Sequence, residues 1–227
     1  MLRTILALPI RTLLDLLYPP RCAGCGDFAG MWWCTSCEAR VHWFKSTDTV
    51  RTAELPDYPS LTVVSAAHFE SPLREAIHAL KYEGVPHVAS LFGARMAHAW
   101  QASSVSFAPT MLVPVPLHPR RERERGYNQS MLLARVVAGV LGLPVERRAV
   151  RRTRRTEKQA QLESHLEARL ANVKGAFTAA PQIVRAQRIL LVDDVFTTGA
   201  TLLTCAAALH AAGAADVAAL TLARTRK

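Results

Sequence analysis

Apolar and polar positions alternate along most of the chain in a pattern typical of an α/β protein. Short apolar runs predict strands at 61–69, 111–115, 189–192 and 217–222. Amphipathic stretches predict helices at 72–81, 88–101, 130–141 and 201–212. Ser130 is a candidate cap of the third helix, and Gly142 follows its end. Strands that alternate with helices indicate a mostly parallel central sheet flanked by helices.

Composition divides the chain into three regions. Residues 1–45 hold four clustered cysteines and three of the four tryptophans, and residues 46–60 are polar and proline-bearing, as in a linker or edge connection. Residues 61–227 form the predicted main domain. The dense basic run 147–155 is expected to be a loop.

The first 20 residues are leucine-rich and fit one face of a short helix. Arg11 and Asp15 interrupt the apolar stretch, and no small-residue cleavage site precedes Pro19, so a signal peptide is not expected. No segment has the apolar length of a membrane span. We therefore expect a cytoplasmic protein.

The chain is strongly basic. Lys and Arg number 28 against 18 acidic residues, which gives a formal net charge of +10. This balance favours anionic partners, namely phosphates, nucleic acid or an acidic surface, and does not choose among them.

The segment 189–202, ILLVDDVFTTGATL, is the strongest chemical motif. It predicts a buried strand, a turn and a helix N-terminus, where backbone N–H groups bind anions. Asp193 and Asp194 are suited to ribose hydroxyls or to a metal–diphosphate. The following turn offers the phosphate contacts; its residues are Thr197, Thr198, Gly199, Ala200 and Thr201. The plainer alternative is an acidic turn with a capping threonine.

VDDVFTTGATL resembles the phosphoribosyl-diphosphate (PRPP) signature of type I phosphoribosyltransferases. The resemblance implies that Asp193 and Asp194 contact the ribose hydroxyls and that the loop 197–201 wraps the 5-phosphate. It also implies Mg²⁺ bridging the diphosphate and the hydroxyls.

The stretch LVPVPLHPR at 112–120 resembles the pyrophosphate loop of glutamine-dependent amidophosphoribosyltransferases. The candidate loop residues are Pro114, Val115, Pro116, Leu117 and His118. Leu117–His118 stands where that family carries an acid and a serine, so the loop supports diphosphate binding more than turnover. His118 is either a phosphate donor or a solvated loop histidine.

Two basic stretches are candidates for further phosphate contacts. Arg123 and Arg125 can bind phosphate in a bidentate manner, although alternating Arg and Glu is also typical of a solvated face. The region 152–177 is the expected counterpart of the flexible loop that closes over substrate in type I enzymes. Its candidate residues are Arg152, Thr156, Gln159 and Arg169. The positive charge of this region would equally suit binding to the phosphates of a nucleic acid.

Cys22, Cys25, Cys34 and Cys37 form two C-x-x-C pairs separated by eight residues. This spacing predicts a structural four-thiolate zinc site, with an iron–sulfur centre or two redox dithiols as alternatives. His42 is a bystander in this interpretation. The tryptophans 32, 33 and 43 either dock the module to the main domain or stack on bases.

The motifs together resemble the ComF family. They occur in order as PRCAGC…WWCTSC, ALKYEG, VPVPLHPRRERERGYNQ, R-x3-T-x2-Q-x2-L ending in NVKGAF, and VDDVFTTGATL. The resemblance implies a type I phosphoribosyltransferase-like domain behind an N-terminal double zinc ribbon or finger. It also implies a link to DNA uptake in natural competence, and partners in the competence machinery.

Two functions of different class follow from this resemblance. The first is an enzyme that transfers phosphoribosyl from PRPP with Mg²⁺. The second is a non-catalytic module that binds single-stranded DNA or uses PRPP or a nucleotide as a signal. An acceptor-binding site would distinguish the enzyme from the binding module. The residues ARTRK follow the last predicted strand directly. A hood over an acceptor base is therefore expected only from residues 1–110, such as the zinc module.

Overall fold

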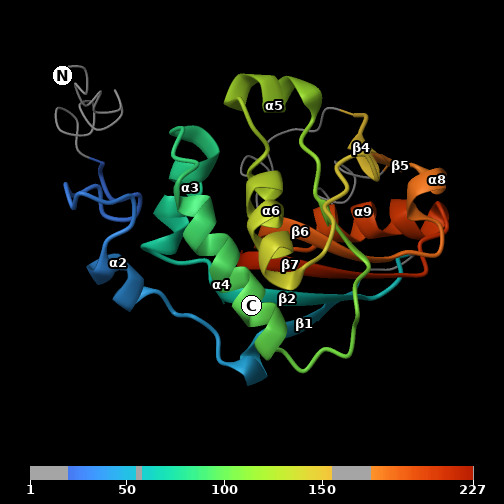
Figure 1. The fold of residues 1–227 in the computed structure, drawn as a ribbon, viewed down its shortest axis with the longest axis horizontal. Coiled ribbons are helices and arrows are strands. Elements are labelled where there is room, and N and C mark those ends of the chain that lie inside the picture. The colour runs from blue at the N-terminus through green and yellow to red at the C-terminus, as the bar shows by residue number, and fades with distance from the viewer. Residues whose placement is uncertain (1–19, 55–57, 155–174, 227) are drawn as a thin grey trace, which may run out of the picture.

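The computed structural model describes residues 20–54, 58–154 and 175–226. Its centre is a five-stranded sheet in the order β1-β2-β7-β6-β3 (Figure 1). The strands are β1 (Val50–Ala53), β2 (Leu61–His68), β3 (Met111–Pro114), β6 (Arg188–Phe196) and β7 (Asp216–Arg224). Four of them run parallel, and β1 is antiparallel to β2. The predicted α/β class is confirmed.

Helices cover both faces of this sheet. They are α3 (Leu73–Tyr82), α4 (Val88–Ala102), α6 (Gln129–Leu141) and α9 (Ala200–Ala211). The strand β6 shows why: Leu190 and Val192 belong to the core under α3, α4 and α6, whereas Ile189 and Leu191 belong to the core under α9. Successive side chains of a strand point to opposite faces, so a continuous apolar run is buried on both sides.

Smaller elements surround the sheet. They are α2 (Thr35–Arg40), the 3-10 turn η1 (Ser46–Asp48), α5 (Pro119–Arg125), α8 (Pro181–Val184), and a two-stranded sheet of β4 (Val150–Arg152) and β5 (Phe177–Ala179). No helix among the described residues is both long and apolar enough to span a bilayer.

Three expectations from the sequence are corrected. The run 147–155 is not all loop, because β4 lies in it and pairs with β5. The cap of α6 is Asn128, not Ser130: the Asn128 side chain accepts from the Ser130 N–H. The strand β6 also runs beyond Val192, so that Asp193 and Asp194 lie within it.

The segment 46–60, expected to be a linker or edge connection, contains β1, whose four residues pair with Leu61–Val64 of β2. Before it, Trp43 makes an antiparallel bridge to Ala67, and the Phe44 N–H donates to the Ala66 carbonyl at 2.8 Å. The chain therefore follows the edge of β2 from residue 42 to residue 53. The division at residues 45 and 60 stays a prediction.

Candidate functional site

The candidate residues gather at one edge of the sheet because the four parallel strands end there. Pro114 ends β3, Phe196 ends β6, and Arg224 ends β7. Thr197 and Thr198 lead from β6 into Gly199, which precedes α9 with a positive φ of 80°. A Cβ on Gly199 would lie 2.8 Å from the Phe196 ring, so this turn requires glycine. Ala200 and Thr201 then begin the helix. The free N–H groups of a helix N-terminus can bind an anion.

Asp193 is held by two hydrogen bonds. Its Oδ1 accepts from Ser130 Oγ and from the Asp194 N–H, both at 2.9 Å. Burial, and then the neighbouring negative charge of Asp194, raise the pKa of Asp193 to about 7. Both effects disfavour the charged form of this carboxyl.

Asp194 is the more buried of the two acids and forms an ion pair that the sequence motif does not reveal. Lys81 Nζ lies 2.6 Å from Asp194 Oδ1, and the side chains are 23% and 4% exposed. Burial opposes the charge on Lys81, but the attraction of Asp194 raises the lysine pKa overall. Asp194 Oδ2 is buried and has no hydrogen-bond partner among the described residues. An unpaired buried carboxylate oxygen needs a donor, and a ligand hydroxyl would provide one.

Lys81 was not among the predicted site residues, although ALKYEG was recognised as a motif. It lies at the C-terminal end of α3, more than 100 residues from Asp194 along the chain. Motif spacing carries no signal for such a contact. An isolated lysine at the end of an amphipathic helix is usually solvated.

Residues 127–130 connect the parts of the site. Tyr127 OH donates to the Leu80 carbonyl at 2.6 Å, next to Lys81. Asn128 Nδ2 donates to the Val115 carbonyl at 3.0 Å, within the predicted pyrophosphate loop. Ser130 follows and holds Asp193. One short segment thus fixes the lysine-bearing helix, the proline-rich loop and the paired acids relative to one another.

The proline-rich loop is anchored at its start. The Val115 N–H donates to the Val192 carbonyl at 2.9 Å, continuing the β3–β6 ladder between Pro114 and Pro116. Leu117 and His118 are half-buried. His118 Nδ1 accepts from the Arg120 N–H at 3.3 Å, so this histidine caps α5.

The structure separates the predicted basic residues. Arg123 is exposed on α5, whereas the Arg125 guanidinium carbon lies 5.1 Å from the Tyr82 ring centroid and Arg125 donates to Gln129. Arg152 lies in β4, 5.4 Å from the Phe177 ring centroid. Burial, followed by repulsion from Arg121, lowers the Arg152 pKa. The candidates Thr156, Gln159 and Arg169 lie outside the described residues.

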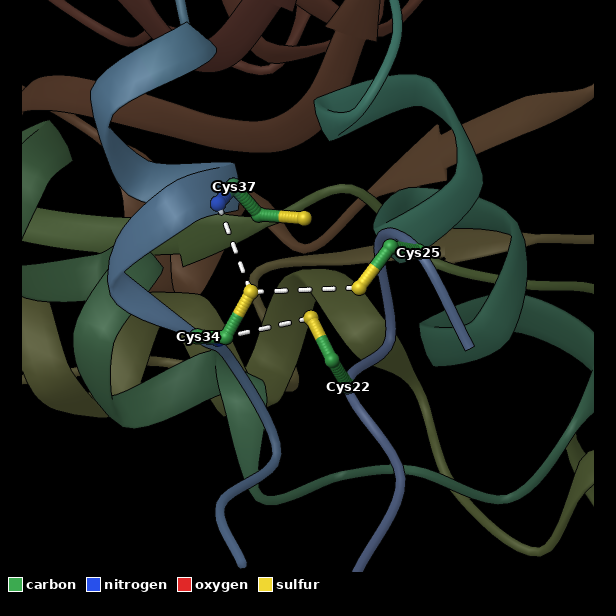
Figure 2. A group of neighbouring side chains, drawn as sticks. All are labelled: Cys22, Cys25, Cys34 and Cys37. Atoms are coloured by element: carbon green, nitrogen blue, oxygen red, sulfur yellow. Dashed lines mark hydrogen bonds between the residues drawn. The ribbon is translucent and has the colours of Figure 1, made fainter. Parts of the chain in front are cut away.

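The four predicted metal ligands converge (Figure 2). The sulfur atoms of Cys22, Cys25, Cys34 and Cys37 all lie within 4.8 Å of one another. The Gly24 and Cys34 N–H groups donate to Cys22 Sγ at 3.4 and 3.3 Å. Burial of Cys22 opposes its thiolate, but backbone N–H groups outweigh it and lower the pKa to about 6. This donor set fits a tetrahedral thiolate-bound Zn²⁺. His42 is not part of the cluster and contacts Glu70 instead.

Tryptophans dock this cysteine module to the main domain. Trp33 packs edge-on against Phe92 of α4, with ring centroids 5.2 Å apart, and its indole N–H donates to Glu38. Glu38 also pairs with Arg95 of α4. Trp32 stacks on His87, with centroids 4.9 Å apart. The docking interpretation is confirmed for Trp32 and Trp33.

Comparison with known families identifies both parts of the chain. Residues 127–227 match the model of the phosphoribosyl transferase domain, and residues 13–48 match the double zinc ribbon domain. The second match and the converging thiolates support a structural zinc ion. The first agrees with the sheet order and with the turn after β6.

Curated relatives match over most of the chain. DNA utilization protein YhgH of Escherichia coli K12 is 36% identical over 171 residues, which is 74% of each chain. Competence protein F of Haemophilus influenzae is 27% identical over 89% of this chain and 90% of its own. Competence protein ComFC of Bacillus subtilis is 34% identical over 51% of this chain and 45% of its own.

Solved structures show only a distant likeness. The glutamine PRPP amidotransferase of B. subtilis is 20% identical with a TM-score of 0.41, and the match covers 60% of this chain and 26% of that one. The adenine phosphoribosyltransferase of Leishmania donovani is 16% identical with a TM-score of 0.37, over 80% of this chain and 63% of that one. The chain thus spans about a quarter of the amidotransferase.

Proposed function

The chain belongs to the ComF family, and from this premise we propose that its main domain binds PRPP with Mg²⁺ and transfers the phosphoribosyl group to an acceptor. Relatives of the chain are named for DNA utilization and competence, which supports a role for this activity in those processes. Partners in the competence machinery belong to the same proposal.

The observation that carries the proposal is the unpaired, buried carboxylate oxygen of Asp194. Its Oδ2 is buried without a partner, in a strand that leads directly into the Gly199 turn. A buried acceptor beside an anion-binding turn matches a ligand that carries both hydroxyls and a phosphate. A ribose 5-phosphate has this combination.

Each part of the site then has a role. Asp193 and Asp194 accept hydrogen bonds from the ribose hydroxyls, and residues 197–201 bind the 5-phosphate through backbone N–H groups and threonine hydroxyls. The loop 114–118, on the neighbouring strand β3, receives the diphosphate. Since β3 and β6 are adjacent, the two loops approach one ligand from the same sheet edge.

The donor set fits Mg²⁺. This ion prefers oxygen ligands, and proteins usually hold it through one or two carboxylates together with substrate phosphates. Asp193 and Asp194 are the acids that would hold it with the diphosphate. When bound, the ion would neutralise charge on the departing diphosphate.

The protein groups act through electrostatics and position. As the C1–O bond to diphosphate breaks, positive charge develops on the ribose and negative charge on the leaving group. Asp193 and Asp194 fix the sugar by its hydroxyls, while Lys81 pairs with Asp194 and adds positive charge within the site. No general base is required of the described residues.

A second candidate function is single-stranded DNA binding by the basic surface around β4. Arg147, Arg148 and Arg151 are exposed there, next to the start of α5 through the Arg147–Glu122 ion pair. Clustered arginines suit a phosphate backbone. In this alternative the pocket holds PRPP or a nucleotide as a signal.

Pyrophosphate release in the presence of PRPP, Mg²⁺ and a panel of bases and amines tests the proposal. We expect release with at least one acceptor, and its loss in Asp193→Asn/Asp194→Asn. Silence across the panel, together with salt-sensitive DNA binding that is lost in Arg148→Gln/Arg151→Gln, would establish the second candidate instead.

A further inference from the structure

A cavity of about 770 Å³ adjoins the proposed PRPP loop. Its wall includes Phe196, Thr197 and Thr198. Ala53 of β1 lies next to the same turn, since a Cβ on Gly199 would be 3.4 Å from it. Ligand sites in proteins have volumes of about 300–1,000 Å³. The cavity therefore has room for a second small molecule beside the first.

The edge segment 42–54 builds another part of the wall. Its lining residues include Asp48 of η1 and, on either side of η1, His42, Trp43, Phe44, Lys45 and Arg51. Backbone pairing with β2 fixes this segment in place, because Trp43 bridges to Ala67 and Val50 pairs with Val64. The chain that follows the cysteine module thus lies along β2 and lines the cavity.

Cations dominate the charge of the cavity wall. The lining contains four cationic side chains and only two acidic ones. The cations are Lys45, Arg51, Arg224 and Arg226, and the acids are Asp48 and Glu54. Arg226 is paired with Glu70, outside the cavity lining. Lys45 and Arg51 are exposed to solvent within it. Such a wall attracts an anionic group.

Arg224 strengthens the positive potential. Its side chain is buried under the Phe44 ring, 4.0 Å from guanidinium carbon to ring centroid, and Nη1 donates to the Thr49 carbonyl at 3.1 Å. No carboxylate of the described residues forms a salt bridge with it. Nη2 also donates to the Asp48 carbonyl, so both terminal nitrogens are held by backbone oxygens, and the charge adds to the positive potential of the wall.

Flat and polar surfaces complete the wall. Phe196 and Trp43 offer aromatic surface. The Trp43 indole N–H and His68 Nδ1 have no hydrogen-bond partner among the described residues. Aromatic surface with spare hydrogen-bonding groups suits a planar ring with a polar edge.

We propose that this cavity is the acceptor site and takes a planar ring that carries a carboxylate. The inference rests on the proposed function and names its substrate class. A ring or amine nitrogen would form the bond to C1 while the C1–O bond to diphosphate breaks. Pyrophosphate leaves with that electron pair, and an N–H acceptor releases one proton to solvent.

Binding is measured by calorimetry with pairs of probes that differ in the carboxylate: orotate against uracil, and nicotinate against nicotinamide. We expect at least one acid to bind about tenfold more tightly than its neutral partner, because the cations of the wall would form charge-assisted hydrogen bonds to its carboxylate. Lys45→Gln/Arg51→Gln removes two exposed cations and should abolish the difference. Arg135→Gln/Arg185→Gln removes two exposed cations outside the cavity lining and should preserve it.

The proposal fails if neither acid exceeds its neutral partner, or if the Lys45/Arg51 variant binds the acid like the wild type. It also fails if a single-stranded oligonucleotide, and no acid, binds in a manner that depends on Lys45 and Arg51. PRPP is titrated separately on the same proteins. Loss of PRPP binding alone would overturn the proposed function, whereas loss of acid discrimination alone would overturn only the acceptor site.

Discussion

Lys81 Nζ lies 2.6 Å from Asp194 Oδ1, and this contact joins the end of α3 to the acidic pair of β6. Removal of the ammonium in Lys81→Met leaves a buried carboxylate without its counter-ion. We expect the free energy of unfolding to fall by about 3–5 kcal/mol in urea titrations, as for other broken buried pairs. Lys81→Met/Asp194→Asn should recover part of this loss. A single variant within about 0.5 kcal/mol of the wild type would show that the pair contributes no stability.

Asn128 makes two separable contacts. Its Oδ1 caps α6 and its Nδ2 donates to the Val115 carbonyl. Asn128→Asp keeps the cap and loses the donor, whereas Asn128→Ala loses both. We expect both variants to weaken PRPP binding, and only Asn128→Ala to lose the additional cap energy of about 1 kcal/mol. Unchanged PRPP affinity in Asn128→Asp would separate the loop anchor from ligand binding.

The raised pKa of Asp193 predicts how stability varies with pH. The carboxyl titrates near 7 in the folded protein against 3.8 as its ordinary value, so the folded state binds the extra proton between these values. Stability should therefore fall as pH rises from about 4 to 7, by at most about 1.4 kcal/mol per unit from this group. Asp193→Asn should flatten this part of the wild-type curve. An unchanged slope in chemical denaturation would contradict the assignment.

The four-cysteine cluster predicts one zinc ion per chain by elemental analysis. Cys22→Ser should lower the zinc content and destabilise the docking of Trp33, since structural zinc contributes directly to folding free energy. Tryptophan fluorescence reports the docking. Cys205→Ala is the matched control, because Cys205 is buried in α9 away from the cluster. Full zinc content in Cys22→Ser would count against a four-thiolate site.

The local pattern of apolar and polar residues was sufficient to predict much of the fold. Continuous apolar runs revealed β2, β3, β6 and β7 because a strand buried on both faces admits few polar residues. The strand β1 was not predicted as a strand, since it is a short edge strand with exposed Arg51 and Thr52. The strands β4 and β5 are three residues each and pair across intervening chain, so neither carries a periodic signal.

The candidate site was predictable only where its residues are adjacent in the chain. Asp193, Asp194 and the Gly199 turn form one motif, and the structure leaves them together. Lys81, Asn128 and the segment 42–54 reach the site through tertiary contacts. Asn128 belongs to the motif VPVPLHPRRERERGYNQ, but the motif does not reveal that this side chain holds the Val115 carbonyl. Contacts of this kind depend on which strands are neighbours in the sheet, and local sequence patterns do not reveal the strand order.

The central claim is that Asp193 and Asp194 bind PRPP. Calorimetric titration with PRPP and Mg²⁺ on the wild type and on Asp193→Asn/Asp194→Asn tests it most directly. Asp216→Asn, a change at an exposed aspartate at the start of β7, serves as control. We predict at least about tenfold weaker binding in the double variant and unchanged binding in the control. Equal affinity of the wild type and the double variant would contradict the account.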